Sequence, residues 1–103
     1  MPTATLPEQE TVIKKQPPYN VILHNDDDHS FGYVIGMLQQ LFGHPVAKGQ
    51  KMALEVHETG RVIVFTTSKE HAELKQEQIQ AFGPDKTIAR CEGSMTCTIE
   101  EAL

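Results

Sequence analysis

Apolar residues in this chain fall into short groups separated by polar, turn-forming segments, and the first group predicts a β-strand. Residues 19–24 include a run of consecutive apolar side chains, and residues 25–28 after them are too polar and turn-prone to continue the strand. Residues 1–18 are rich in proline and polar side chains, with little apolar surface to bury. We therefore expect a flexible tail that leads into the first strand.

Two helices are predicted after the polar turn. Residues 30–42 carry apolar side chains at helical spacing, with Ser30 or Asp28 as the N-cap and a glycine just past the end. A second helix begins near Pro45, where proline suits the first turn, and stops before Gly60. Its apolar side chains also form one stripe, so each helix has a face to bury.

The second half of the chain repeats the alternation of strand and helix. Residues 61–66 contain a run of β-branched and aromatic side chains, which predicts a central strand buried on both faces or nearly so. Residues 67–70 have the form of a capping box, so a third helix should follow and continue to about Phe82. Residues 94–99 predict the last strand, with 100–103 as a short end. The expected fold is α+β, with three helices packed on one side of a small three-stranded antiparallel sheet.

Composition limits the kind of protein and its partners. The chain has 103 residues, 39% of them hydrophobic, which suits one soluble domain over residues 19–103 after the tail. The formal net charge of −5 disfavours nucleic acid and anionic membranes as partners. No apolar run is long enough to span a bilayer, and the residues that follow Met1 lack the pattern of a secretory leader. We expect a cytoplasmic protein in which Cys91 and Cys97 are free thiols.

The densest group of polar side chains lies at residues 24–29 and leaves several interpretations open. Its carboxylates and imidazoles suit a divalent metal, but the spacing matches neither a calcium loop nor a zinc motif. A plain loop whose side chains cap the next helix is the stronger interpretation. No nucleophile lies in a recognisable elbow, which disfavours an enzyme. His57, at the end of the second helix, fits either an interaction with the helix dipole or a ligand-binding role.

Four runs of the chain together resemble the ClpS family, the small adaptors that deliver proteins with destabilising N-terminal residues to a Clp AAA+ protease. The runs are YNVILHNDD at 19–27, MALEVHETG at 52–60, EHAELK at 70–75 and CTIE at 97–100. They follow the family's order, with nearly its spacing through the third helix, and cover most of the chain after the tail. The separation between the polar turn and the valine-histidine pair is the most specific part of the resemblance.

The resemblance implies a binding site between the first two helices and no cofactor or metal. The residues that it assigns to a peptide's free α-amino group are Asn25, Asp27 and His57, with Asp26 adjoining. Those that it assigns to an apolar pocket for the first side chain are Phe31, Val34, Ala53, Val56 and Met95. An ammonium group presents several donors and needs converging acceptors, which agrees with the first set. Glu70 and Lys75 match positions that dock on the protease, although a solvated helix face would look the same.

The chain departs from the family's pattern at several of these positions. Phe31 and Ala53 stand where the better-known members carry methionine, so the order of preference among Phe, Tyr, Trp and Leu stays open. Residues 28–30 replace the commoner aromatic-threonine-proline run, and residues 84–93 form a longer connection. These changes bear on the start of the first helix and on the place of Met95.

The sequence therefore predicts a monomeric, non-catalytic adaptor that binds a free, bulky N-terminal residue and hands its substrate to a Clp unfoldase of the ClpA or ClpC type. The tail at residues 1–18 looks like the extension that assists delivery. Two other functions remain open. An interaction domain of similar fold would have no amine pocket, and a metal-dependent enzyme would need an ion at residues 24–29.

Overall fold

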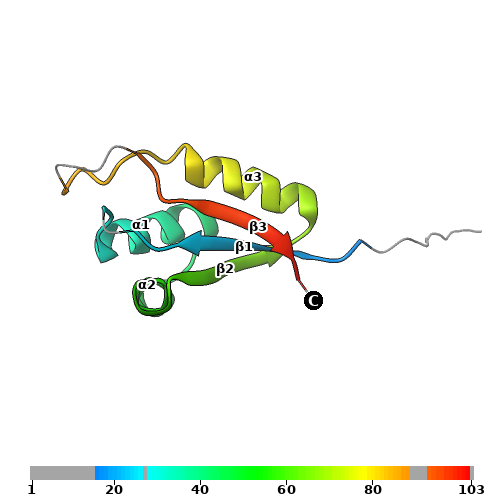
Figure 1. Cartoon of the computed structure of the whole chain (residues 1–103), viewed down its shortest axis with the longest axis horizontal. Coiled ribbons are helices and arrows are strands. Elements are labelled where there is room, and N and C mark those ends of the chain that lie inside the picture. Colours follow the sequence, from blue (N-terminus) through cyan, green and yellow to red (C-terminus); the bar gives the residue numbers. More distant parts are fainter. Residues whose placement is uncertain (1–15, 27, 89–92, 103) are drawn as a thin grey trace, which may run out of the picture.

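The computed structural model describes residues 16–26, 28–88 and 93–102, so most of the predicted tail at 1–18 lies outside the described residues. Strands and helices alternate along the chain as predicted (Figure 1). They are β1 (Tyr19–His24), α1 (Phe31–Phe42), α2 (Val46–Thr59), β2 (Arg61–Thr67), α3 (Lys69–Gln80) and β3 (Cys97–Glu101). The three strands form one antiparallel sheet, which confirms the α+β prediction.

The first strand, not the second, is the central one. The strand order is β2-β1-β3, and all three apolar residues of β1 are fully buried. In the edge strand β2, Val62 and Val64 are buried whereas Ile63 between them is 46% exposed. The prediction that residues 61–66 form a central strand buried on both faces is therefore wrong. An antiparallel edge strand needs only one apolar face, and β-branched residues also suit its open face.

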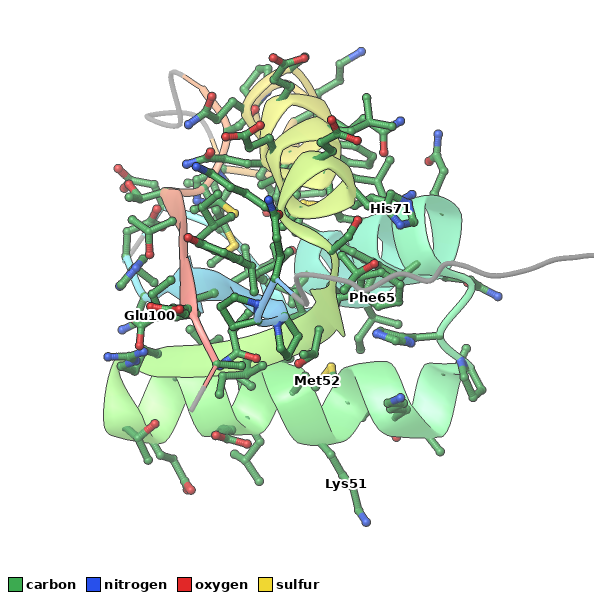
Figure 2. The ribbon with its side chains drawn as sticks, turned by 90° about the vertical axis from the view of Figure 1, so that its right-hand side faces the viewer. Lys51, Met52, Phe65, His71 and Glu100 are labelled. Carbon is green, nitrogen blue, oxygen red and sulfur yellow. The ribbon has the colours of Figure 1, made fainter. Side chains whose placement is uncertain are left out.

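The last strand also differs from its predicted range. β3 begins at Cys97 and continues through Glu101, because it pairs with β1 from Leu23↔Cys97 to Tyr19↔Glu101. The stretch predicted as a short end thus supplies the last part of a strand. On the open face of the sheet, Arg61 and Glu100 form an ion pair with a nitrogen–oxygen distance of 3.2 Å. Figure 2 shows Glu100 on the side of the sheet away from the helices.

The three helices cover the other face of the sheet and enclose the core. α2 packs on β2, α3 packs on β1 and β3, and α1 lies between the two helices (Figures 1 and 2). Each contributes buried apolar side chains to one continuous cluster with the strands. Its helical members are Val34, Met37, Leu38, Ala53, Val56, Ala72 and Ile79. The apolar stripes predicted for the helices are the faces that this core buries.

Helix ends follow local capping chemistry. Ser30, not Asp28, caps α1, because its Oγ accepts a hydrogen bond from Tyr33 N at 3.1 Å. In α3 the cap is Ser68, whose Oγ accepts from His71 N at 3.3 Å. The helix therefore starts one residue later than a capping box at 67–70 implies, and it ends at Gln80, before the predicted Phe82.

Gly36 lies on the exposed side of α1, and replacing it with alanine should stabilise the protein. A Cβ built there meets no atom within 4 Å, and alanine has the higher helix propensity. We expect the free energy of unfolding to rise by about 0.5–1 kcal/mol. The matched control is Gly60→Ala, where the space is equally open but φ is +92°. That change should lower the free energy of unfolding, because L-residues avoid this conformation. Urea titration of both variants measures the two effects. Equal effects of the two changes would contradict this explanation.

Candidate functional site

The turn after β1 is fixed against the end of α2 and the segment before β3. Asn25 N donates a hydrogen bond to Gly60 O at 2.9 Å, and His24 N donates to Thr96 O at 3.0 Å. Since Gly60 directly follows α2, Asn25 lies beside the last turn of that helix. Its side chain is exposed and makes no hydrogen bond within the described ranges. The Asn25 amide is thus held at this corner with its own polar atoms available.

His57 lies on the last turn of α2 and faces the start of α1. The rings of His57 and Phe31 meet edge to face, with centroids 5.5 Å apart and planes at 68°. His57 is exposed, and Phe31 is 43% exposed. The bond between Asn25 and Gly60 brings the first polar turn to the same end of α2. Three residues that the sequence selected, Asn25, Phe31 and His57, therefore meet at one corner of the fold.

Four of the five residues predicted to line the side-chain pocket lie in the core. Val34, Ala53, Val56 and Met95 belong to one cluster, and none is more than 3% exposed. The described residues leave no open pocket beside them. A ligand side chain would therefore enter only if part of this wall moved. Met95, which is unbranched and flexible, and Phe31, at the surface, are the members most able to do so.

One carboxylate oxygen of Asp26, Oδ1, makes contacts within the protein. Its Oδ1 accepts a hydrogen bond from Asp28 N at 2.9 Å and contacts His29 Nδ1 at 2.6 Å. The other ring nitrogen of His29 donates to Gly93 O at 2.7 Å. Asp26 thus supports the turn through Oδ1, and its place beside the amine-binding residues stays a prediction. Asp27 lies outside the described residues.

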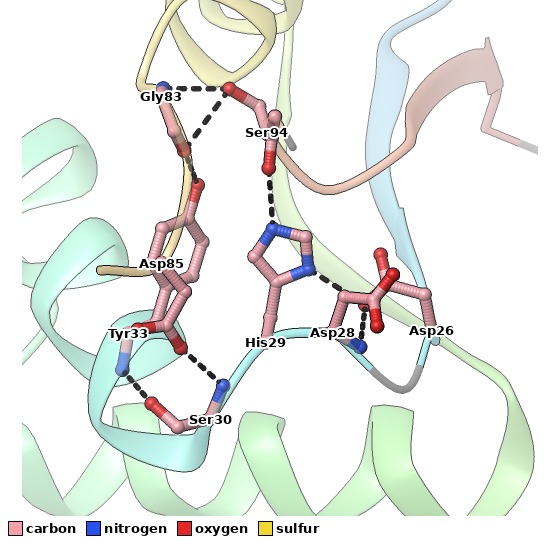
Figure 3. A network of polar contacts seen from close by, with 9 residues as sticks. Asp26, Asp28, His29, Ser30, Tyr33, Gly83, Asp85 and Ser94 are labelled. Atoms are coloured by element: carbon pink, nitrogen blue, oxygen red, sulfur yellow. Dashed lines mark hydrogen bonds and ion pairs between the residues drawn. The ribbon is translucent and has the colours of Figure 1, made fainter. Parts of the chain in front are cut away.

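A second carboxylate, Asp85, holds the start of α1 (Figure 3). The Asp85 carboxylate accepts from Ser30 N at 2.6 Å, and from Thr87 N and Oγ1 at 2.9 and 2.7 Å. Burial alone would raise the pKa of Asp85, but the hydrogen bonds from Thr87 and Ser30 outweigh it and hold this pKa well below its usual range. Tyr33 Oη also donates to Gly83 O at 2.5 Å. The connection after α3 is therefore fastened to the first turn of α1.

Comparisons with known proteins decide the family. The family model described as "ATP-dependent Clp protease adaptor protein ClpS" matches residues 14–89. This chain belongs to the ClpS family. A ClpS adapter of Vibrio atlanticus (strain LGP32) is 33% identical over 96 residues, spanning 93% of this chain and 86% of the relative. One from Pectobacterium carotovorum subsp. carotovorum (strain PC1) is 35% identical over 91 residues, spanning 86% and 81%.

A solved structure supports the ClpS fold. Agrobacterium tumefaciens ClpS2, bound to L-phenylalaninamide, matches with a TM-score of 0.73 over 85% of this chain and 100% of its own. The sequence identity of 24% is low, so this likeness shows the fold alone. As a member of the ClpS family, the protein is an adaptor of a Clp protease and not an enzyme.

The two charged residues predicted to dock on the protease, Glu70 and Lys75, differ in their contacts with the rest of the protein. Glu70 is exposed in the first turn of α3. Lys75 Nζ donates to Leu41 O at 2.5 Å, near the end of α1, and lies 5.3 Å from the Phe42 ring centroid. The Lys75 ammonium thus stabilises the C-terminal end of α1, whereas Glu70 is exposed to solvent.

Metal binding and a reactive thiol, the alternatives that the sequence left open, have little support among the described residues. In the described part of the chain, no three His, Cys, Asp or Glu side chains group as metal ligands would. Burial raises the pKa of the Cys97 thiol to about 11, which keeps it protonated and unreactive. Cys91 lies outside the described residues. None of the described helices has the length and hydrophobicity to cross a membrane.

Sequence reasoning missed two residues that shape this corner, His29 and Asp85. The sequence marked residues 28–30 as a departure from the family's pattern, which points to His29 but not to its partners. Asp85 and Thr87 have the spacing of a local Asx turn, and that contact was predictable. The bond from Ser30 N to Asp85 joins residues far apart in the chain, and no local pattern reveals it.

Proposed function

We propose that this ClpS family member binds peptides through a free, bulky apolar N-terminal residue and delivers their proteins to a Clp AAA+ unfoldase. The observation that carries the proposal is the meeting of Asn25, Phe31 and His57 at the end of α2. This corner joins exposed polar atoms to the buried apolar wall at Val34 and Val56. An N-terminal residue has the matching character, with a charged amine next to an apolar side chain.

The amine half of the site uses acceptors only. A terminal ammonium offers three N–H donors, and Asn25 Oδ1, a His57 ring nitrogen and the Asp27 carboxylate are the acceptors that we assign to it. A carboxylate also supplies the opposite charge. Acetylation of the peptide removes both the charge and donors, so it should remove binding. Asp26 supports the turn in this scheme and does not itself hold the amine.

The apolar half of the site opens when the ligand side chain enters. We infer that Met95 changes rotamer and that Phe31 moves at the rim, which exposes a space between Val34, Ala53 and Val56. Phe, Tyr, Trp and Leu are unbranched at Cβ and fit such an opening. Ile and Val are branched at Cβ, which makes them too wide at the entrance. The ligand of the similar Agrobacterium structure, L-phenylalaninamide, combines a free amine with an aromatic side chain and supports this assignment.

Delivery uses a surface distant from the peptide corner. We propose that Glu70 on α3 contacts the N-domain of a ClpA- or ClpC-type unfoldase, with Lys75 shaping the surface through its bond to α1. The adaptor acts as a monomer in the cytoplasm, where that unfoldase works. Residues 1–18 are assigned to the delivery step.

A peptide panel tests the specificity. Fluorescence anisotropy would compare labelled peptides that differ only in the first residue: Phe, Tyr, Trp, Leu, Ile, Val or Ala. We expect the first four to bind at least about 10-fold more tightly than the others, because the apolar contact and the branched Cβ act in the same direction. Equal affinity across the panel would contradict the side-chain pocket. Failure of every peptide would instead favour an interaction domain without an amine site.

A further inference from the structure

We propose that His29 is a positioning residue that couples the two halves of the peptide site. It links the turn that carries Asn25 and Asp26 to the segment that carries Met95. This inference rests on the proposed function, because it assigns a role within the same site. It does not follow from the family resemblance, since residues 28–30 are a point where this chain departs from the family's pattern.

The contacts of His29 are short and protected from water. Its side chain is only 3% exposed, and its two ring nitrogens lie 2.6 Å from Asp26 Oδ1 and 2.7 Å from Gly93 O. Carboxylate and carbonyl oxygens are acceptors, so the ring that makes both contacts donates from both nitrogens. Hydrogen bonds to a charged group are stronger than neutral ones. His29 therefore acts as a two-ended clamp between segments that are far apart in the chain.

Each end of the clamp acts on a different half of the site. At one end, Asp26 Oδ1 also accepts from Asp28 N, so the bond to His29 fixes the conformation of the turn next to Asn25. At the other end, Gly93 is two residues before Met95, which is 2% exposed in the apolar wall. The Tyr33 ring packs against the imidazole with centroids 4.5 Å apart and limits its rotation (Figure 3).

This arrangement explains how the longer connection after α3 can retain a defined site. Asp85 ties the early part of the connection to Ser30 N, and His29 ties its late part to Asp26. Movement of Met95 on ligand entry is thus mechanically linked to the turn that presents the amine acceptors.

Two substitutions separate the ends of the clamp. His29→Asn places an amide nitrogen near the position of Nδ1, so it can keep the bond to Asp26 but not the bond to Gly93. His29→Gln reaches further and can keep the bond to Gly93 but not the bond to Asp26. The matched control is Tyr33→Phe, which removes the hydrogen bond to Gly83 O but leaves both ends of the clamp.

The test is titration of each variant with a peptide that has a free N-terminal Phe, together with methyl NMR of Met95. We expect both His29 variants to weaken binding about 3- to 30-fold, the effect of losing one charge-assisted hydrogen bond. His29→Asn should also shift the Met95 methyl signal, whereas Tyr33→Phe should change affinity less than about 2-fold. Asp26→Ala already removes the bond between His29 and Asp26. Adding His29→Gln to that variant should therefore weaken binding no further.

The outcomes distinguish this inference from the proposed function. Unchanged affinity in both His29 variants, in a wild-type background that binds the peptide, would overturn the clamp alone. Additive losses in the double variant would also overturn it, because they would show a general loss of stability and not one shared contact. Absence of binding by the wild-type protein would overturn the proposed function, and the clamp's role in recognition with it.

Discussion

Replacing His57 with alanine is expected to weaken the binding of a peptide with a free N-terminal Phe about 10- to 100-fold. The change removes a ring nitrogen that we assign to the ammonium group, and it also removes the edge-to-face contact with Phe31. Because His57 is exposed at the end of α2, the fold should tolerate the change. The measurement is a calorimetric titration beside a thermal melt.

The matched control is His71→Ala. His71 is also an exposed histidine whose ring meets a phenylalanine edge to face, in this case Phe65 with centroids 5.7 Å apart. It lies on α3, away from the corner at the end of α2, as the view in Figure 2 indicates. Peptide affinity should be the same as in the wild-type protein. Comparable losses in the two variants would mean that His57 acts through general stability and not through the ligand.

Replacing Asp85 with alanine is expected to lower the free energy of unfolding by about 3 kcal/mol, or the melting temperature by about 10–20 °C. The carboxylate is 4% exposed and accepts hydrogen bonds from Ser30 and Thr87. Without it, the Ser30 and Thr87 N–H groups lose a charged acceptor in a buried place, and the start of α1 loses its link to the connection after α3. The control is Glu77→Ala, which removes an exposed carboxylate on α3. It should change the free energy of unfolding by less than about 0.5 kcal/mol.

The Asp85 carboxylate should also make the free energy of unfolding depend on pH, with lower stability in acid. The pKa of Asp85 is lower in the folded state than its ordinary value of 3.8, so its stabilisation is complete above that value. This stabilisation is lost progressively as the pH falls below 3.8, because the carboxyl group of the unfolded chain binds a proton at a higher pH than that of the folded protein. Asp85→Asn should therefore be less stable at neutral pH but lose less stability between about pH 5 and pH 2. Parallel acid profiles of wild type and variant would contradict this assignment.

The elements of the fold were largely predictable because their signals are local. The apolar run at Tyr19–His24 and the capping serine of α1 each depend on neighbours within a few residues. The place of a strand in the sheet does not. Residues 61–66 look like a central strand, yet β1 takes that place, since burial on two faces depends on pairing with β2 and β3. The end of β3 was missed for the same reason.

The candidate site shows the same division. The family resemblance selected Asn25, Phe31 and His57, and a backbone bond and a ring contact bring them together at one corner. The engagement of Asp26 by His29 was not predictable, because it depends on Gly93 and on a connection whose length differs from the family's pattern. The sequence identifies residues of suitable chemistry, whereas the fold decides which of them remain available to a ligand.

The central claim is recognition of a free N-terminal amine beside an apolar side chain. Calorimetric titration with two peptides, identical except that one has a free N-terminal Phe and the other an acetylated one, tests it most directly. We predict that only the peptide with the free amine binds. Acetylation removes its charge and the N–H donors from which Asn25 and His57 would accept hydrogen bonds. Equal binding of the two peptides, or no binding of either or of peptides that begin with Leu, Tyr or Trp, would contradict the claim.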